Sequence, residues 1–343
     1  MAPSKLIATL DAYLARAADR RGRRGLPAPQ VLVMAPDFEY TFGDQQMPFH
    51  AASIGKLATA ALVMQEVELG RVALDASVTD LLPASVTAGL FTGPGATVEQ
   101  LLAHTSGIAD YFEGKADGPR FIDIVVRETD TMWQPDDLLA FTRDRQRPVG
   151  APGQRFAYSD TGYVLLGRIL EELTGVSFTD LLRSRIFGPA GMTESVLWLR
   201  EPGPAEIAPL WLNGVEASQF RSVSCDWAGG GIVSTLSDLA RLGRAMADGT
   251  LVTRSTYELM TTARHRFRPG IWYGLGAMEL RYGGFMPLLR LPRAYGHLGV
   301  LGTHLFGDEK STIVMNFHDT REMRASFQTH VRIQQGLNRL SRD

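Results

Sequence analysis

A serine and a lysine three residues apart, Ser53 and Lys56, form the pair in this sequence best suited to nucleophilic chemistry. Residues at this spacing share one face of a helix, so the hydroxyl and the amine can form a hydrogen bond. A serine attacks a carbonyl when a neighbour takes its proton, and a lysine can do so when burial or nearby positive charge lowers its pKa. The structural alternative is that Ser53 caps a helix and Lys56 lies on a solvated face. Apolar residues at 51–52 and 57–58 favour burial and the catalytic interpretation.

Lysine is scarce in this chain, which makes the position of Lys56 informative. Only four of the 35 basic residues are lysines, at positions 5, 56, 115 and 310, and the other 31 are arginines. Arginine keeps its proton in proteins and cannot serve as a base. A lysine next to a candidate nucleophile therefore occupies a position where arginine would not serve.

The composition bounds the class of protein. With 343 residues, 45% of them hydrophobic and 21% charged, the chain is typical of a globular protein with about two domains or one large insertion. A net charge of −2 gives no basic excess for nucleic acid. We find no apolar run long enough to span a membrane and no secretion signal, so we predict a cytoplasmic protein with no membrane partner.

Motifs for other chemistries are absent from the sequence. There is no phosphate-binding loop, no dinucleotide fingerprint and no zinc-binding helix, so we predict no cofactor and no metal. Cys225 is the only cysteine, which excludes an intrachain disulfide, and we interpret it as a buried structural thiol.

Strands are predicted near both ends of the chain and helices in the middle. A helix is expected from Ser53 to about Gly70, and another begins at Asp160 or Thr161 and stops at Gly175. The strand-like runs are 31–34, 39–42, 271–280, 294–297, 303–306 and 312–317. Consecutive runs are joined by hairpin signals, which favours an antiparallel sheet over a doubly wound parallel one.

Five segments of the chain resemble, in order, the motifs of one family. The segment 49–56, which contains Ser53 and Lys56, resembles the active-site serine motif of serine β-lactamases and penicillin-binding proteins, especially the branch of class C β-lactamases, family VIII esterases and D-aminopeptidases. The other segments look like the family's L-L-x-H-T-S-G, Y-x-N, glycine-rich and K-T-G motifs, the last in an H-x-G form, and they are residues 101–108, 156–163, 229–235 and 295–299. The resemblance covers about residues 30–340.

This resemblance implies a fold and a domain division. The fold is of the α/β (α+β) class, a β-lactamase/transpeptidase-like antiparallel sheet flanked by helices. The sheet domain comprises residues 1–57 and 226–343, and a mostly helical domain is inserted at residues 58–225. The active site is expected in the cleft between the two.

The resemblance also assigns roles to residues. Ser53 is the nucleophile that becomes acylated, Lys56 helps to deprotonate it, and Tyr158 is the general base or the proton relay to the leaving group. The main-chain N–H groups of Ser53 and Val300 form the oxyanion hole. His297 and Gly299 line the edge of the substrate site, and His104 is a structural loop residue. Six aromatic residues are further candidates for a pocket lining: Tyr111, Phe112, Trp211, Phe220, Trp227 and Trp272.

Asp160 departs from the family's pattern, which has Asn in the Y-x-N motif. Asn both donates and accepts hydrogen bonds, whereas an ionised Asp only accepts. Asp160 either pairs with Lys56 and keeps it charged, binds a substrate amine or hydroxyl, or simply caps a helix. In each case the change argues against β-lactam antibiotics as the principal substrate.

The function implied is that of a serine hydrolase that forms an acyl-enzyme on Ser53. We expect an esterase acting on small esters, with weak β-lactamase activity as a side reaction. The alternatives are a D-amino-acid amidase or peptidase, an acyltransferase in small-molecule biosynthesis, and a non-catalytic binding protein of the same fold. The expected partner is a small-molecule ester or amide, and the sequence leaves the oligomeric state open.

Overall fold

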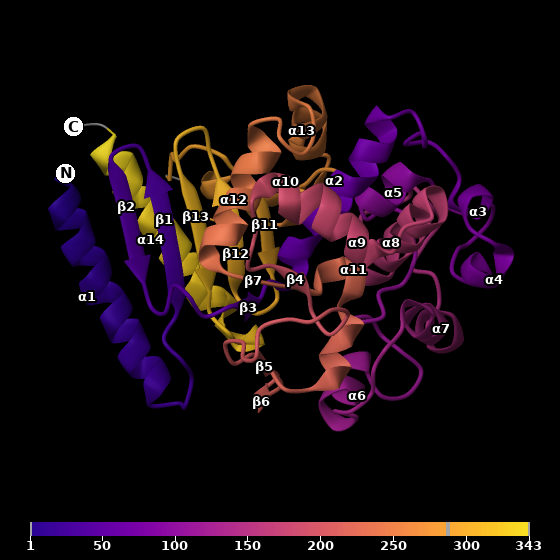
Figure 1. Ribbon diagram of the computed structural model, residues 1–343, viewed down its shortest axis with the longest axis horizontal. Coiled ribbons are helices and arrows are strands. Elements are labelled where there is room, and N and C mark those ends of the chain that lie inside the picture. Colours follow the sequence, from indigo (N-terminus) through magenta and orange to yellow (C-terminus); the bar gives the residue numbers. More distant parts are fainter. Residues whose placement is uncertain (1, 286–288, 342–343) are drawn as a thin grey trace.

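An antiparallel sheet flanked by helices organises the computed structural model, which describes residues 2–285 and 289–341 (Figure 1). The eight strands lie in the order β2-β1-β13-β12-β11-β10-β9-β8, and every neighbouring pair is antiparallel. Their bounds are β1 Gln30–Ala35, β2 Phe38–Phe42, β8 His265–Arg268, β9 Ile271–Tyr273, β10 Met278–Leu280, β11 Ala294–Gly299, β12 Thr303–Gly307 and β13 Thr312–Asn316. The antiparallel fold class predicted from the sequence is confirmed.

Helices cover both faces of this sheet. Helices α1 (Pro3–Gly22) and α14 (Met323–Leu340) lie on one face, and α12 (Leu236–Ala247) packs against β1, β12 and β13 on the other. Along α1 the buried Leu residues recur every four positions, which forms an apolar stripe against the sheet. No helix within residues 2–285 and 289–341 has the length and apolarity needed to cross a bilayer.

The helical part of the molecule lies between β2 and β8 in the chain. Its helices are α2 Gly55–Glu68, α3 Val78–Leu81, α4 Ala84–Thr87, α5 Val98–Leu102, α6 Phe121–Arg127, α7 Pro135–Arg145, α8 Asp160–Thr174, α9 Phe178–Leu182, α10 Gly188–Ala190, α11 Trp227–Gly230 and α13 Arg254–Thr261. Short strands accompany them: β3 Phe49–His50, β4 Val196–Leu197, β5 Trp211–Leu212, β6 Val215–Glu216 and β7 Ile232–Ser234. Helix α8 packs against α2, α5, α7 and α11, which makes it the centre of this part. The domain boundaries at residues 57/58 and 225/226 stay a prediction.

Two predicted elements differ in detail from the structure. The run 271–280 is not one strand but the hairpin of β9 and β10, because Gly276 takes a left-handed turn conformation with φ +77°. The helix expected to begin at Ser53 begins at Gly55 instead, and Ser53 lies in a 3₁₀ turn formed by Ala52–Ile54. Both differences come from short-range backbone geometry that hydrophobic periodicity does not report.

The turn that carries Ser53 is held between two glycines. A Cβ added at Gly230 would lie 2.6 Å from the backbone carbonyl carbon of Ala52, and one added at Gly299 would lie 2.7 Å from the Ala52 Cβ. Real Cβ atoms do not approach other atoms this closely, so α11 and β11 can reach the turn only because they carry glycine at these positions. The backbone around Ser53 is therefore closely packed on both sides.

Replacing Gly230 with Ala should move the Ser53 turn. We expect a lower melting temperature, since overpacking of this kind costs about 1–3 kcal/mol, and at least about a tenfold slower reaction of Ser53 with a fluorophosphonate. Gly22→Ala is the matched control, because a Cβ at Gly22 meets nothing within 4 Å. Unchanged stability and labelling in Gly230→Ala would contradict the packing argument.

Candidate active site

The side chain of Lys56 is fully buried, and its ammonium lies among three acceptors. Lys56 Nζ donates to Ser53 Oγ at 2.9 Å, to the carbonyl oxygen of Gly229 at 2.6 Å and to the carboxylate of Asp160. An ammonium has three donors and no acceptor, so these three partners satisfy it completely. The geometry therefore fits a charged Lys56 that holds the Ser53 hydroxyl in place.

The three acceptors come from separate elements that pack against one another. Ser53 precedes α2, Asp160 is the first residue of α8, and Gly229 lies in α11, and each of these helices contacts the other two. Asp160 is well placed at its helix N-terminus, where the helix dipole favours negative charge. Of the three roles open to Asp160, the geometry is that of the first, an ion pair with Lys56.

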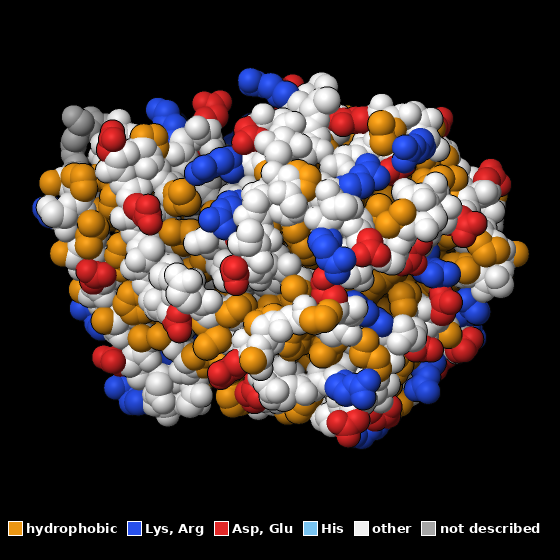
Figure 2. All heavy atoms as spheres, viewed as in Figure 1, with side chains coloured by type: hydrophobic (Ala, Val, Ile, Leu, Met, Phe, Trp, Pro, Cys, Tyr) orange, Lys and Arg blue, Asp and Glu red, His pale blue; other side chains and the backbone are white. Residues whose placement is uncertain are grey.

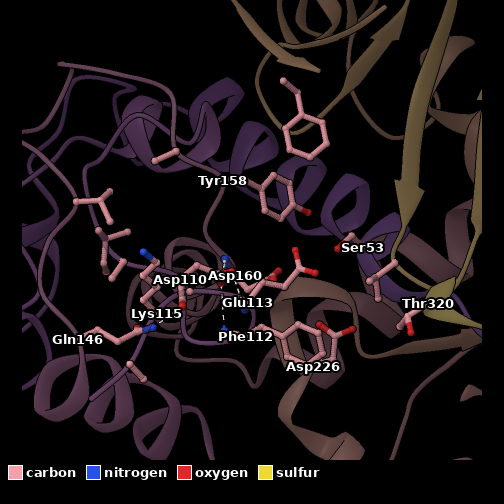
Figure 3. A pocket seen from close by; sticks show the side chains of 18 of the residues that line it. Ser53, Asp110, Phe112, Glu113, Lys115, Gln146, Tyr158, Asp160, Asp226 and Thr320 are labelled. Carbon is pink, nitrogen blue, oxygen red and sulfur yellow. Dashed lines mark hydrogen bonds between the residues drawn. The ribbon is translucent and has the colours of Figure 1, made fainter. Parts of the chain in front are cut away.

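Tyr158 lies beside this pair with its hydroxyl directed toward Ser53 (Figure 3). Its ring centroid is 5.1 Å from Lys56 Nζ and 4.1 Å from the imidazole of His104. Burial, and next the negative charge of Asp160, raise the pKa of Tyr158 well above its usual value near 10, while a hydrogen bond with Ser53 lowers it. The phenol therefore keeps its proton near neutral pH, which favours a proton relay over a standing phenolate base.

The imidazole of His104 packs against the ring of Tyr158. Its Nδ1 accepts a hydrogen bond from the backbone N–H of Ser159 at 3.1 Å, next to the tyrosine in the chain. Burial, followed by the charge of Lys56, holds the pKa of His104 well below 6.5, so the ring is neutral and can accept this bond. This placement agrees with the structural role predicted for His104.

The residues predicted to form the oxyanion hole and substrate edge separate into two groups. Val300 follows the end of β11 and lines the same cavity as Ser53, and Gly299 is buried beside Ala52. His297 is fully buried: its Nε2 accepts from the Tyr273 hydroxyl at 3.0 Å and its Nδ1 donates to the Leu298 carbonyl at 2.7 Å. Its side chain is not part of the cavity lining, so the substrate contact predicted for it does not fit this placement.

A cavity of about 870 Å³ opens at Ser53, and carboxylates line one side of it. Figure 3 shows Asp110, Glu113, Asp160 and Asp226 on the opposite side of the cavity from Tyr158. Three of these four, all except Asp160, were not among the predicted site residues. A signal was available, because Asp110 follows the 101–108 motif by two residues and Asp226 precedes Gly229 by three.

Two of these carboxyl groups titrate near neutrality. Burial, and then the charge of Asp160, raise the pKa of Asp110 to about 7. Burial and Asp160 raise the pKa of Asp226 to about 7 as well, against the lowering effect of Lys56. Burial also raises the pKa of Glu113, with a further contribution from Asp160. Near neutral pH, Asp110 and Asp226 are therefore partly protonated.

Much of the remaining lining is apolar or basic. Phe112, Phe267 and Phe327 supply aromatic surface, and four exposed cations lie at the margin: Lys115, Arg145, Arg147 and Arg268. Of the six aromatic residues predicted as pocket candidates, Phe112 lines this cavity. Tyr111 is buried in the core, where its hydroxyl donates a hydrogen bond to the Cys225 carbonyl. Within residues 2–285 and 289–341, no group of three or more His, Cys, Asp or Glu side chains is arranged to hold a metal ion.

Comparison with known proteins identifies the family. A family model described as Beta-lactamase matches residues 41–335. The chain belongs to the β-lactamase family. Members of this family are serine hydrolases, which agrees with the arrangement of Ser53, Lys56 and Tyr158 at one end of the cavity.

Curated relatives include penicillin-binding proteins. The chain is 38% identical to penicillin-binding protein 4 of Amycolatopsis lactamdurans over 151 residues, which is 43% of this chain and 35% of that protein. It is 25% identical to the putative penicillin-binding protein PbpX of Bacillus subtilis over 263 residues, 76% of this chain and 62% of that protein. The chain therefore spans less than two-thirds of the length of these relatives.

Solved structures of amidases share the whole fold. A D-stereospecific amidohydrolase from Streptomyces sp. is 27% identical to this chain, with a TM-score of 0.74. The match covers 92% of this chain and 94% of the amidohydrolase. The D-amino acid amidase from Ochrobactrum anthropi, solved with L-phenylalanine amide, has a TM-score of 0.78 at 23% identity and covers 98% of this chain and 100% of that one. The second likeness shows the fold alone.

Lys56→Arg should abolish acylation of Ser53. The guanidinium is larger and planar, and it cannot take the place of a compact ammonium among three acceptors. We expect labelling by a fluorophosphonate, followed by intact-mass spectrometry, to slow at least about a hundredfold. Lys115→Arg is the control, because Lys115 lines the same cavity at an exposed position. Near-normal labelling of Lys56→Arg would contradict the role assigned to the lysine.

Proposed function

We propose that this protein is a hydrolase, acylated at Ser53, that cleaves small amides or esters whose acyl part carries a free ammonium group. The observation that carries the proposal is the cluster of carboxylates on the wall of the Ser53 cavity. Asp160 is paired with Lys56, which leaves Asp110, Glu113 and Asp226 without a cationic partner in an ion pair among the described residues. A substrate ammonium supplies the positive charge that this wall lacks.

Charge coupling favours such a ligand. Asp110 and Asp226 are both held near pKa 7 by burial and by mutual repulsion with Asp160. An ammonium between them favours their ionised forms, because an opposite charge nearby lowers the pKa of a carboxyl group. Binding of a cation therefore ionises the wall, and the paired charges hold the cation in a partly desolvated site.

The proposed reaction proceeds by acyl transfer in two halves. Ser53 Oγ attacks the substrate carbonyl and gives its proton to Tyr158 Oη, while the phenol passes its own proton to the departing amine or alkoxide. The N–H groups of Ser53 and Val300 are the proposed donors to the oxyanion. Water then attacks the acyl-enzyme, and the same relay runs in reverse to restore Ser53.

The comparisons support amides as the first choice and leave esters as the second. The Streptomyces protein named a D-stereospecific amidohydrolase matches nearly the whole chain at 27% identity, and curated D-aminopeptidases from Cereibacter sphaeroides match at 30% over 134 residues. The sequence alone favours small esters, and esterase activity remains a prediction. Location in the cytoplasm also stays a prediction from the sequence.

A free amine on the substrate should accelerate turnover in a pH-dependent way. We compare D-alanine p-nitroanilide with its N-acetyl derivative and expect a kcat/KM at least about tenfold higher for the free amine. The ratio should grow between pH 6 and 7.5, because Asp110 and Asp226 ionise around pH 7 while the substrate amine is still mostly protonated. Equal turnover of the two substrates, or a ratio that does not change with pH, would count against the proposal.

Asp226→Asn should weaken binding of the amine and stabilise the fold. The KM for the free-amine substrate should rise about tenfold, with a much smaller change for p-nitrophenyl acetate, which has no charge to recognise. The pKa of Asp226 is raised in the folded chain, so its ionisation costs stability increasingly as pH rises from about 4 through about 7. The melting temperature of the variant should therefore exceed that of the wild type more at pH 8 than at pH 5.

Asp117→Asn provides the matched control for Asp226→Asn. Asp117 lines the same cavity but is exposed, so its replacement should change neither the KM nor the melting temperature appreciably. If the two Asn variants behaved alike, Asp226 would have no special part in recognising the amine.

A further inference from the structure

The residue immediately before Ser53 has an unusual backbone conformation. Ala52 has φ +51°, in the left-handed region that residues with a Cβ seldom adopt. It is buried, and it is the first residue of the 3₁₀ turn that contains Ser53. A conformation of this kind persists only where surrounding contacts hold it, and a directional contact to the Ala52 amide is one of them.

His50 makes the contact to the Ala52 amide. Its Nδ1 accepts a hydrogen bond from the backbone N–H of Ala52 at 3.2 Å. The histidine is 4% exposed and lies in β3, where it pairs with Val233 of β7, so the ring is anchored by a strand. Because Nδ1 accepts, the ring is neutral and carries its proton on Nε2. Burial lowers the pKa of His50 to about 4, consistent with a neutral ring.

The other side of the ring offers no competing protein partner. Nε2 has no hydrogen-bond partner among the described residues, and the ring borders a cavity of about 20 Å³, room for roughly one water molecule. Ala52, Asp226 and Val300 line the same small cavity. Among the described residues, the hydrogen bond with the Ala52 N–H is thus the polar contact that holds the His50 ring.

Close packing alone does not set the turn. Gly230 and Gly299 leave just enough room for Ala52, as their absent Cβ atoms show, but they make no directional bond to its amide. The hydrogen bond that the Ala52 N–H donates to His50 Nδ1 fixes the direction of this N–H, and the orientation of the Ala52 backbone in turn affects where Ser53 places its side chain. Ser53 Oγ must reach both Lys56 Nζ and the Tyr158 hydroxyl, which leaves little tolerance in that placement.

We propose that His50 is a positioning residue for the nucleophile: its Nδ1 holds the Ala52 amide, stabilises the left-handed turn and thereby aims Ser53 at Lys56 and Tyr158. The inference rests on the proposed function, because it requires that Ser53 be the acylated residue. It differs from a packing role, in which the ring of His50 would only fill space between β3 and the Ser53 turn.

A pair of amide variants separates the two roles. In His50→Asn the side-chain oxygen can take the place of Nδ1, whereas in His50→Gln it lies one bond farther from the backbone. Gln is closer to His in volume, so a packing role favours the Gln variant and a hydrogen-bonding role favours the Asn variant. We expect His50→Asn to label with a fluorophosphonate within about threefold of wild type, and His50→Gln to label about 10–100-fold more slowly.

Steady-state kinetics with p-nitrophenyl acetate give a second measurement. For His50→Gln, kcat should fall while KM changes little, because the substrate-lining residues are intact. Adding Ala52→Gly to His50→Gln should restore most of the labelling rate, since glycine adopts φ near +51° without the penalty of a Cβ. A packing defect would not be repaired by removing a methyl group from the neighbouring residue.

The outcomes are distinct from those that test the proposed function. Absence of labelling at Ser53 in the wild-type protein would overturn the proposed function itself. Normal labelling of the wild type, with His50→Asn as slow as His50→Gln or with His50→Gln at the wild-type rate, would overturn the role of His50 alone. Failure of either amide variant to fold would make that role structural and would overturn it as well.

Discussion

The buried positive charge of Lys56 is the constraint on which the rest of the structure depends. An ammonium removed from water costs several kcal/mol unless partners replace its hydration. Here the partners come from positions 53, 160 and 229, far apart in the chain. Helices α2, α8 and α11 must therefore meet at one point, and the glycines of α11 allow the backbones to approach closely there. The charged surface outside is unremarkable by comparison, with acidic and basic side chains interspersed over the face seen in Figure 2.

The partner of Lys56 also sets the protonation of its surroundings. Asp160 neutralises the lysine, yet its own charge contributes to the raised pKa values of Tyr158, Asp110 and Asp226. Burial is the largest cause of all three shifts, and the charge of Asp160 adds to it at the phenol and at both neighbouring acids. With Asn at this position, as in the family's motif, that charge would be missing. The departure from the motif and the acidic character of the cleft are therefore parts of the same electrostatic arrangement.

The sequence predicted what depends on short spacing and on motif order. The three-residue interval singles out the pair Ser53 and Lys56, the family resemblance supplies their expected roles, and hairpin signals between apolar runs predict the antiparallel sheet. The sequence did not predict the carboxylates beside Asp160, because Asp110 and Asp226 become its neighbours only after folding. His297 was placed at the substrate by its motif, whereas the register of β11 and the bond with Tyr273 turn its side chain into the core. The left-handed turn at Ala52 leaves no mark in hydrophobic periodicity at all.

The glycine contacts on both sides of the Ser53 turn have a consequence for how this protein can change. Backbone packed against backbone has no side chain to vary, so the half of the cleft made by α11 and β11 is a fixed template. Two of the four carboxylates that line the cavity, in contrast, belong to the connection between α5 and α6. These are Asp110 and Glu113, and both lie in a loop. A substitution at exposed Glu113 leaves the three partners of Lys56 in place. Asp110 is less free to change, because it accepts a hydrogen bond from the backbone N–H of Asp160. We therefore expect changes in selectivity to come from side chains of this connecting loop, while the close packing around Ser53 stays the same.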